Sequence, residues 1–273
     1  MKATKVAFGD NKPKCRKFTV LREVSVKNIT SRRNVKCLHV KNLGKSKEYR
    51  YQHGEFLCDG VKLLEEAIKS EADIIDVFTT SQLKINLPKH SSVYNIDESI
   101  MDSLSALKNP QGILFTCKIP EEIPYDLCTG THILLDNVQD PGNIGAIIRT
   151  ADAFGIDSVL LTQDCADPYN PKTVRASMGA IFRQKVSFIS IDELKSSKAR
   201  IIGTGSKSGE YYYINDMNLS NAVIVLGNEG QGISDSLKAM CDEMLTIPLT
   251  QNCESLNVSI AASIIMWEAK KGR

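Results

Sequence analysis

Three polar loops in the second half of the chain carry the residues best suited to chemistry, and each loop follows an apolar run. They span residues 136–155, 224–234 and 247–262. Open α/β sheets place their ligand sites in such loops, just outside the carboxyl ends of the strands. The glycines of the second loop permit close backbone approach to a flat ligand. Three loops of this kind in one domain predict one composite pocket.

The polar side chains of these loops also have structural explanations. Asn143 and Ser255 stand where helix N-caps are expected. Arg149 could be a surface residue that extends out of a packed helix. Glu229 lies between glycines, which argues against a salt bridge on a helix surface, and Asn257 is an unusual residue inside an apolar helix. The last two features favour a role in the pocket.

Several chemical classes are disfavoured by the same residues. The second loop reads G-N-E-G-Q-G, which is not the dinucleotide pattern G-x-G-x-x-G, and the chain has no Walker-type G-K-[ST]. Its eight cysteines are scattered without a C-x-x-C pair, which argues against a zinc site and favours reduced thiols. We therefore expect neither a dehydrogenase nor an NTPase, and no metal.

Composition indicates an ordinary globular protein with a charge asymmetry. The 273 residues are 42% hydrophobic and 24% charged, with no apolar run of membrane-spanning length and no apolar core of a secretory signal at the start. We expect a cytoplasmic protein with no membrane contact. The first 50 residues hold fifteen Lys or Arg and three Asp or Glu, a balance of +12, so the remainder sums to −10. A basic end on an acidic protein favours a polyanion such as RNA as partner, although a solvated basic tail would look the same.

The hydrophobic pattern predicts two units. Residues 29–118 read as a small α/β unit, with strands at 55–58, 74–78, 93–96 and 112–116 and helices at 60–67 and 100–107. Residues 119–127, with two prolines and three acids, predict a linker. The segment before the first unit, 1–28, could be a disordered extension, an upstream start or an added strand.

From residue 128 onward, strands and helices alternate. The predicted strands are 132–135, 158–161, 186–189, 201–204, 222–226 and 244–247. The predicted helices are 144–154, 171–179, 191–197, 234–240 and 256–270. This spacing predicts an α/β domain over residues 128–273, with a parallel sheet and helices on both faces.

The three loops resemble the signature motifs of the SpoU/TrmH family, within the SPOUT superfamily of S-adenosylmethionine-dependent RNA ribose 2′-O-methyltransferases. The match to N-x-G-x-x-x-R-T-A is complete from residue 143 to 151, and L-G-N-E-G-Q-G-I-S, I-P-L and E-S-L-N-V-S follow in the family's order. The resemblance extends over residues 29–267. It implies a C-terminal SPOUT domain with a deep trefoil knot, and a smaller N-terminal α/β domain similar to ribosomal proteins that bind kinked RNA.

The resemblance also implies roles for individual residues. The catalytic set is Arg149, Asn143, Glu229, Ser255 and Asn257. The cofactor contacts are expected at Thr204, Gly205, Leu226, Gly227, Gly232, Ile247, Leu249 and Leu256. The RNA contacts are expected at Arg32, Arg33, Lys172 and Arg175. The family role of Arg149 is that of a general base, but a guanidinium is not expected to lose its proton. An alternative role is to bind the substrate phosphate and stabilise the developing alkoxide.

The expected function is methylation of a ribose 2′-hydroxyl in RNA by a cytoplasmic homodimer that uses S-adenosylmethionine. The extra N-terminal domain favours large-subunit ribosomal RNA, because family members that act on transfer RNA often lack it. Transfer RNA remains the alternative substrate. A catalytically silent RNA-binding protein is disfavoured by the complete polar set, and a small-molecule methyltransferase by the N-terminal charge and the RNA-binding type of the first domain.

Overall fold

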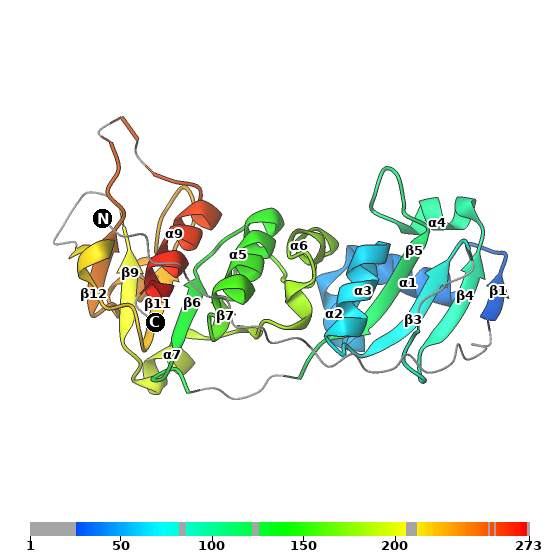
Figure 1. The fold of residues 1–273 in the computed structure, drawn as a ribbon, viewed down its shortest axis with the longest axis horizontal. Helices are drawn as coiled ribbons and strands as arrows, with labels where there is room; N and C mark the ends of the chain where they lie inside the picture. Colours follow the sequence, from blue (N-terminus) through cyan, green and yellow to red (C-terminus); the bar gives the residue numbers. More distant parts are fainter. Residues whose placement is uncertain are drawn as a thin grey trace, which may run out of the picture.

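The computed structural model describes residues 26–81, 86–121, 126–205, 212–250, 252–253 and 255–271. These residues form two α/β units that lie side by side along the long axis of the molecule (Figure 1). The first unit contains the described residues up to 121, and the second contains those from 126 onward. Most of the basic extension, residues 1–25, lies outside the described ranges.

The first unit is built on a five-stranded sheet with the order β1-β4-β3-β5-β2. β1 (Val26–Ile29), β4 (Ser92–Ile96) and β3 (Ile74–Thr79) run parallel to one another. β5 (Ile113–Lys118) pairs antiparallel with β3 and with β2 (Glu55–Asp59). β1 begins three residues before the predicted start of this unit, which is in keeping with the added strand considered for the N-terminal segment.

The described part of this unit has four helices that cover the sheet. They are α1 (Val35–Lys45), α2 (Lys47–His53), α3 (Val61–Lys69) and α4 (Glu98–Leu104). Neither α1 nor α2 was predicted, because their basic sequence has little apolar periodicity. The caps were the available signal: the Asn34 side chain accepts from the Lys36 backbone N–H at 2.9 Å, and Ser46 accepts from that of Tyr49 at 3.1 Å.

Side chains of the first sheet alternate between two cores. Phe56 and Cys58 of β2 face α3, whereas Leu57 between them faces the side covered by α1 and α4. On β5, Phe115 and Leu114 divide in the same way. Successive side chains of a strand point to opposite faces of the sheet, so a sheet covered by helices on both faces has apolar residues at successive positions.

The second unit is built on a seven-stranded sheet in which every described pairing is parallel. Its order is β10-β12-β9-β11-β6-β7-β8. The strands are β6 (Thr131–Leu135), β7 (Ser158–Leu161), β8 (Val186–Phe188), β9 (Ile201–Thr204), β10 (Tyr212–Tyr213), β11 (Ala222–Leu226) and β12 (Glu243–Thr246). The predicted α/β fold with a parallel sheet is confirmed; β10 was not predicted.

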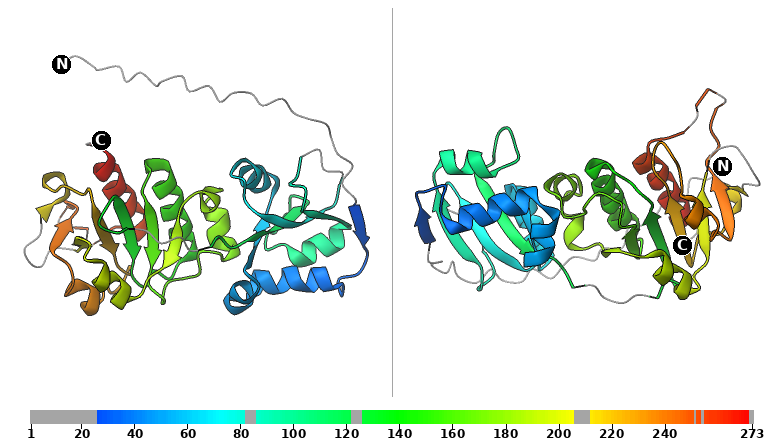
Figure 2. Two further views of the ribbon diagram at one scale, coloured as in Figure 1. Left: turned by 90° about the horizontal axis from the view of Figure 1, so that it is seen from below. Right: turned by 180° about the vertical axis from the view of Figure 1, so that it is seen from behind.

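Helices lie on both faces of this sheet (Figure 2). α5 (Pro141–Phe154) and α9 (Val258–Lys270) pack side by side on one face, and α7 (Ile191–Ser197) and α8 (Asp235–Lys238) lie on the other. Strand residues alternate accordingly between the two cores. α6 (Pro171–Ala176) packs against α5 and against β2 of the first unit. Short 3₁₀ helices are also present, η1 (Ala180–Phe182) and η2 (Ile214–Asp216).

Several predicted helix ends are wrong, among them that of α4, which ends at Leu104 rather than at residue 107. α5 begins at Pro141 with Asp140 as its N-cap, so Asn143 is not the cap but lies in the first turn; proline at the first helical position was the overlooked signal. α9 is capped by Asn257 rather than by Ser255. α6 ends before residue 177, because Met178 and Gly179 have left-handed backbone, with φ of 51° and 92°.

Other features can be stated for the described ranges only. No helix in them is long and apolar enough to cross a membrane. The seven cysteines they contain are all free thiols. They hold no group of three or more His, Cys, Asp or Glu arranged to hold a metal ion.

The contact between α5 and α6 leads to a stability prediction. A Cβ at Gly145 would lie 2.5 Å from both the Ala176 Cβ and the Thr173 carbonyl oxygen, so Gly145→Ala must push the helices apart. We expect the free energy of unfolding, measured by urea denaturation, to fall by about 1–3 kcal/mol. Gly142→Ala in the same helix is the matched control, because its Cβ would meet only the Asp140 carboxyl group at 3.4 Å and beyond. Equal stability of the two variants would contradict the close packing.

Candidate active site

A cavity lies at the carboxyl ends of β9, β11 and β12, which are neighbours in the second sheet. Its volume is about 730 Å³, which is in the range of ligand pockets. All eight residues expected to contact the cofactor line it: Thr204, Gly205, Leu226, Gly227, Gly232, Ile247, Leu249 and Leu256. Of the expected catalytic residues, Glu229 and Ser255 line it as well.

The chemistry of the lining suits an uncharged flat ligand. Apolar side chains alternate with glycine backbone and a few hydroxyl and amide groups. Among the described residues of the lining there is no Lys, Arg or His. A cofactor rich in phosphate would need such cations, or the free N–H groups of a helix N-terminus, to balance its charge. The N-terminus of α9 lies beside the cavity, but Asn257 Oδ1 already accepts from its Ser259 and Ile260 N–H groups. The cavity therefore fits a nucleoside without phosphate groups better than a dinucleotide or a nucleoside triphosphate.

Asn228 organises the loop that follows β11, and sequence reasoning did not single it out. Its Oδ1 accepts from the backbone N–H groups of Gly230 at 2.8 Å and Gln231 at 3.2 Å. Its backbone exchanges two hydrogen bonds with Gly232, at 3.0 and 2.9 Å. Its Nδ2 donates to the Asn137 carbonyl at 2.9 Å, which ties this loop to the first motif. Asparagine closing a turn through its own side chain was the available signal.

The glycines of this loop are not equivalent. A Cβ at Gly227 would lie 2.0–2.2 Å from the backbone of Gly232 and Ile233, so only glycine fits there. Gly232 has φ of 73°, in the left-handed region that favours glycine. At Gly230, in contrast, a Cβ would meet only the Asn228 Oδ1, at 3.5 Å. The tight closure of the loop therefore depends on Gly227 and Gly232.

Asn143 joins the three motifs beside the cavity. Its Nδ2 donates to Glu229 Oε1 at 2.5 Å, and its Oδ1 accepts from Asn257 Nδ2 at 3.1 Å. Asn257 in turn caps α9, with its Oδ1 accepting from the Ser259 backbone N–H at 3.0 Å. One polar side chain from each loop thus meets in a single junction, which is the composite site that the loops predicted.

Arg149 lies outside this junction. It is exposed, does not line the cavity, and has no hydrogen-bond or ion-pair partner among the residues that the structure describes. Six residues along α5 place it about 9 Å further along the helix axis than Asn143. The next residue, Thr150, contacts Ser263 of α9 at 3.4 Å between hydroxyl oxygens. Arg149 is therefore an available cation at the edge of the α5–α9 surface.

The thiol of Cys241, which follows α8, has a structural role. Cys241 packs against β9, where a Cβ at Gly203 would lie 2.7 Å from its Sγ. Burial raises the pKa of the Cys241 thiol to about 11, so it stays protonated at neutral pH. The thiol donates to the Leu237 carbonyl at 3.3 Å. A neutral, hydrogen-bonded thiol is a poor nucleophile, so Cys241 offers no covalent chemistry to the site.

The residues expected to contact RNA fall into two groups that lie apart. Arg32 and Arg33 are exposed in the turn after β1, at one edge of the first sheet, and Arg32 Nη2 donates to the Ser99 carbonyl at 2.8 Å. Lys172 and Arg175 are exposed on α6, which packs against β2 at the opposite edge. The two groups flank the first unit: one lies at its far end, and the other lies on α6 of the second unit, next to β2 (Figure 1).

Both units match known protein families. The model of the SpoU rRNA Methylase family matches residues 130–267, which include all three motifs. The model of the MRM3-like substrate binding domain matches residues 34–114, within the first unit. The resemblance that the motifs carry is therefore confirmed, and it extends to both parts of the chain.

Individual relatives agree with these matches over nearly the whole length. The 23S rRNA (guanosine(2553)-2′-O)-methyltransferase RlmP of Bacillus subtilis is 36% identical, covering 90% of this chain and 100% of its own. A TrmH-family structure from Porphyromonas gingivalis is 31% identical with a TM-score of 0.77, covering 86% of this chain and 97% of its own. The AdoMet-bound rRNA methyltransferase from Sinorhizobium meliloti is 25% identical with a TM-score of 0.79, covering 90% and 98%. Two matching units, three motifs joined in one pocket and relatives over most of the sequence place this chain in the SpoU rRNA methylase family.

Proposed function

We propose that this protein transfers the methyl group of S-adenosylmethionine to a ribose 2′-hydroxyl of large-subunit ribosomal RNA. The observation that carries the proposal is the cavity of about 730 Å³ beside the junction of Asn143, Glu229 and Asn257. The Bacillus subtilis relative is a 23S rRNA methyltransferase, and the Sinorhizobium meliloti structure is AdoMet-bound, which supports both substrates. A ribosomal RNA substrate also favours the expected cytoplasmic location.

The residues that line the cavity fit this cofactor. When bound, S-adenosylmethionine supplies an electrophilic methyl group. The loop closed by Asn228 brings glycine backbone to the cavity, where a flat base can lie against it, and Leu226, Ile247 and Leu256 supply apolar contacts for the faces of the base. The described lining contains no Lys, Arg or His, so no cationic side chain there would repel the positively charged sulfonium. These residues would exclude water and hold the methyl group near the Asn143 junction.

The polar junction and Arg149 suit the RNA side of the reaction. Asn143 occupies only one carboxylate oxygen of Glu229, so Oε2 is left to accept a hydrogen bond from a ribose hydroxyl. The guanidinium of Arg149 can bind the neighbouring phosphate and stabilise the oxyanion that forms as the 2′-hydroxyl loses its proton. The proton of the hydroxyl passes to Glu229 Oε2, the free acceptor, as the oxygen bonds to the methyl group and the carbon–sulfur bond of the cofactor breaks.

The first unit is proposed to select the RNA. The chain then consists of a basic extension (1–28), an RNA-binding unit (29–118), a linker (119–127) and a methyltransferase unit (128–273). The match to a substrate-binding domain supports the second of these. We also propose that the first unit resembles ribosomal proteins that bind kinked RNA, with Arg32, Arg33, Lys172 and Arg175 as phosphate contacts. Transfer RNA stays the alternative substrate.

A trefoil knot is proposed for the end of the second unit. The strand order supports it: β12 lies on the far side of β9 from β11, so the chain must cross β9 between them. It then returns to place α9 against α5, near the middle of the sheet. The knot itself is expected from the family resemblance, because strand order alone does not define a knot.

The exposed face of α9 supports the proposed homodimer. Ile260, Ile264 and Trp267 are 53%, 36% and 57% exposed and recur at helical spacing on one face. The Trp267 ring packs against that of Phe154 on α5, with 5.9 Å between centroids, so the apolar surface spans both helices. A second copy of the chain that covers this surface would also lie close to Arg149, which is exposed on the same pair of helices.

Cofactor binding should depend on the closure of the second loop. We expect Gly227→Ala to abolish binding of S-adenosylmethionine in isothermal titration calorimetry, because its Cβ would collide with the Gly232 backbone. Gly230→Ala, with room for a Cβ, is the matched control and should bind as the unmodified protein does. Treatment with EDTA should change neither result. Binding that survives Gly227→Ala, or that requires a metal, would rule out this account of the cavity.

Methyl transfer should depend on Arg149 while cofactor binding does not. Arg149→Ala should lower the single-turnover rate on 23S ribosomal RNA transcribed in vitro by about 10²-fold, as for loss of one preorganised electrostatic contact. Arg149→Lys should rescue poorly, because an ammonium cannot form the planar fork. Lys238→Ala, an exposed cation of α8, is the control. A near-normal rate for the Arg149→Ala variant would mean that Arg149 is only a surface residue. If the unmodified protein methylates transfer RNA and not ribosomal RNA, the alternative substrate is favoured.

The dimer should depend on the apolar face of α9. Trp267→Glu should convert the dimer to monomers in size-exclusion chromatography with light scattering, because burying an unpaired carboxylate in an apolar interface is costly. Val35→Glu, at an apolar residue that is 76% exposed in the first unit, is the control and should leave the mass unchanged. A Trp267→Glu protein that stays dimeric would place the interface elsewhere.

A further inference from the structure

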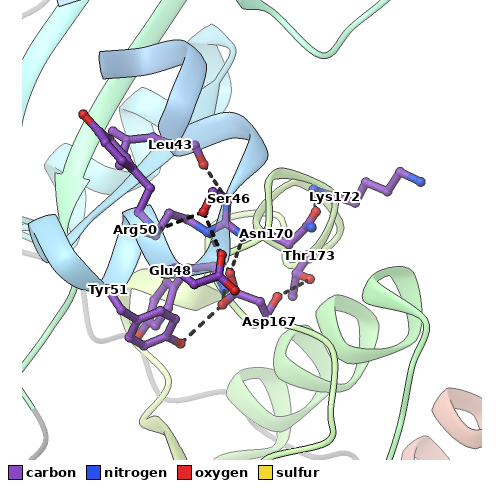
Figure 3. A network of polar contacts seen from close by, with 11 residues as sticks. Leu43, Ser46, Glu48, Arg50, Tyr51, Asp167, Asn170, Lys172 and Thr173 are labelled. Atoms are coloured by element: carbon purple, nitrogen blue, oxygen red, sulfur yellow. Dashed lines mark hydrogen bonds and ion pairs between the residues drawn. The ribbon is translucent and has the colours of Figure 1, made fainter. Parts of the chain in front are cut away.

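The interface between the two units contains a buried ion pair (Figure 3). Arg50 of α2 and Asp167, in the loop before α6, are 2% and 5% exposed. Arg50 Nε donates to Asp167 Oδ2 at 2.7 Å, and Nη2 lies 2.5 Å from the same oxygen. The two residues are 117 positions apart in the sequence and come from different units.

Each partner of the pair is also anchored in its own unit. Arg50 Nη1 donates to the Leu43 carbonyl of α1 at 2.5 Å. Asp167 Oδ1 accepts from the Tyr169 backbone N–H at 3.0 Å and from the hydroxyl of Tyr51, across the interface, at 3.3 Å. Burial and the charge of Asp167 raise the pKa of Tyr51, so its hydroxyl remains a donor. The guanidinium and the carboxylate are therefore fixed in direction as well as in distance.

Adhesion between the units does not need this pair. Phe56 of β2 packs on Tyr169 and Phe182 of the second unit, with centroid separations of 5.0 and 6.1 Å, inside one apolar core that runs through both units. A buried ion pair adds little net stability, because desolvation offsets the attraction. Apolar contacts, however, tolerate small rotations, whereas charged hydrogen bonds with fixed directions do not. The pair thus adds orientation to an interface that is already cohesive.

A short path of close contacts connects this pair to the active site. The Asp167 carbonyl accepts from Thr173 Oγ1 of α6 at 3.0 Å. α6 is pressed against α5 at Gly145, where there is no room for a Cβ beside Ala176. α5 carries both Asn143 and Arg149. The orientation of the first unit is therefore set relative to the helix that holds two of the proposed catalytic residues.

We propose that Arg50 and Asp167 are positioning residues that hold the RNA-binding unit in one orientation to α5. RNA bound by the first unit then presents its target ribose to the transfer site at a fixed distance and angle. This inference rests on the proposed function for its consequence in catalysis, but the fixed orientation of the two units can be measured without any activity. Substituting the pair should lower the methylation rate of bound RNA and leave the affinity for RNA unchanged.

The test uses the double variant Arg50→Met/Asp167→Asn. It removes both charges together, so neither is left buried without a partner, and the new carboxamide keeps an oxygen for the Tyr169 N–H. We expect the melting temperature, the cofactor affinity and the affinity for in vitro transcribed 23S ribosomal RNA to stay near those of the unmodified protein. The single-turnover methylation rate at saturating RNA should fall by about 10-fold or more, since small misplacements of reacting groups are costly.

Two further variants separate positioning from stability and from RNA affinity. Arg183 also bridges the units, from Glu66 at 2.6 Å to Asp152 of α5 at 2.8 Å, but its side chain is 37% exposed. Arg183→Gln is the matched control and should change the rate less than about two-fold, because exposed pairs contribute little. Arg32→Ala/Arg33→Ala should instead lower the affinity for RNA and its dependence on salt.

A second readout does not depend on catalysis. Small-angle X-ray scattering of the unmodified protein should fit one arrangement of the two units, and scattering of the double variant should require more than one. A double variant that methylates saturating RNA at the normal rate, or that scatters as a single arrangement, would overturn the proposal. If the unmodified protein methylates neither ribosomal nor transfer RNA, the proposed function fails, and the scattering comparison still decides whether the pair fixes the orientation.

Discussion

Three neighbouring parallel strands, β12, β9 and β11, end at the same edge of the second sheet, and the candidate site depends on that adjacency. Each strand is held by its neighbours through backbone hydrogen bonds, and the apolar side chains of β9 and β11 alternate between two cores. The loops that leave these strands must therefore share one space. The apolar strands supply the frame, and the glycine-rich loops supply a cavity that no single loop could form.

Within that frame, two asparagines convert flexible loops into a defined site. Asn228 closes the loop after β11 on itself and ties it to Asn137, whereas Asn143 joins Glu229 to Asn257. Carboxamides suit this work because each offers both donors and acceptors without a charge. The described lining of the cavity stays free of cationic side chains as a result, while Arg149 of α5 stands at the edge where an RNA phosphate could reach it.

The first unit depends on the second for its orientation. Its sheet has its own two cores, but one of them continues through α3 and β2 into α6 and the residues below α5. This shared core makes the two units cohere, and the pair of Arg50 and Asp167 gives the contact a direction. Arg32 and Arg33 after β1 and the cavity at the other end of the molecule are thereby held in one arrangement, which is what a long, structured RNA substrate would require.

The sequence by itself determined the family, the parallel-sheet unit and many of the residues that line the cavity, because these depend on short motifs and on local apolar periodicity. It did not indicate α1 and α2, whose basic sequences carry little periodicity, and it assigned the caps of α5 and α9 to the wrong residues. Only the tertiary structure decided that Asn143 meets Glu229 and Asn257, that Asn228 shapes its loop, and that Arg149 stands apart from them. It alone revealed Arg50 and Asp167, which are ordinary residues in their own segments. Their significance comes from proximity and burial across 117 positions, and contacts at that separation leave no local pattern in a single sequence.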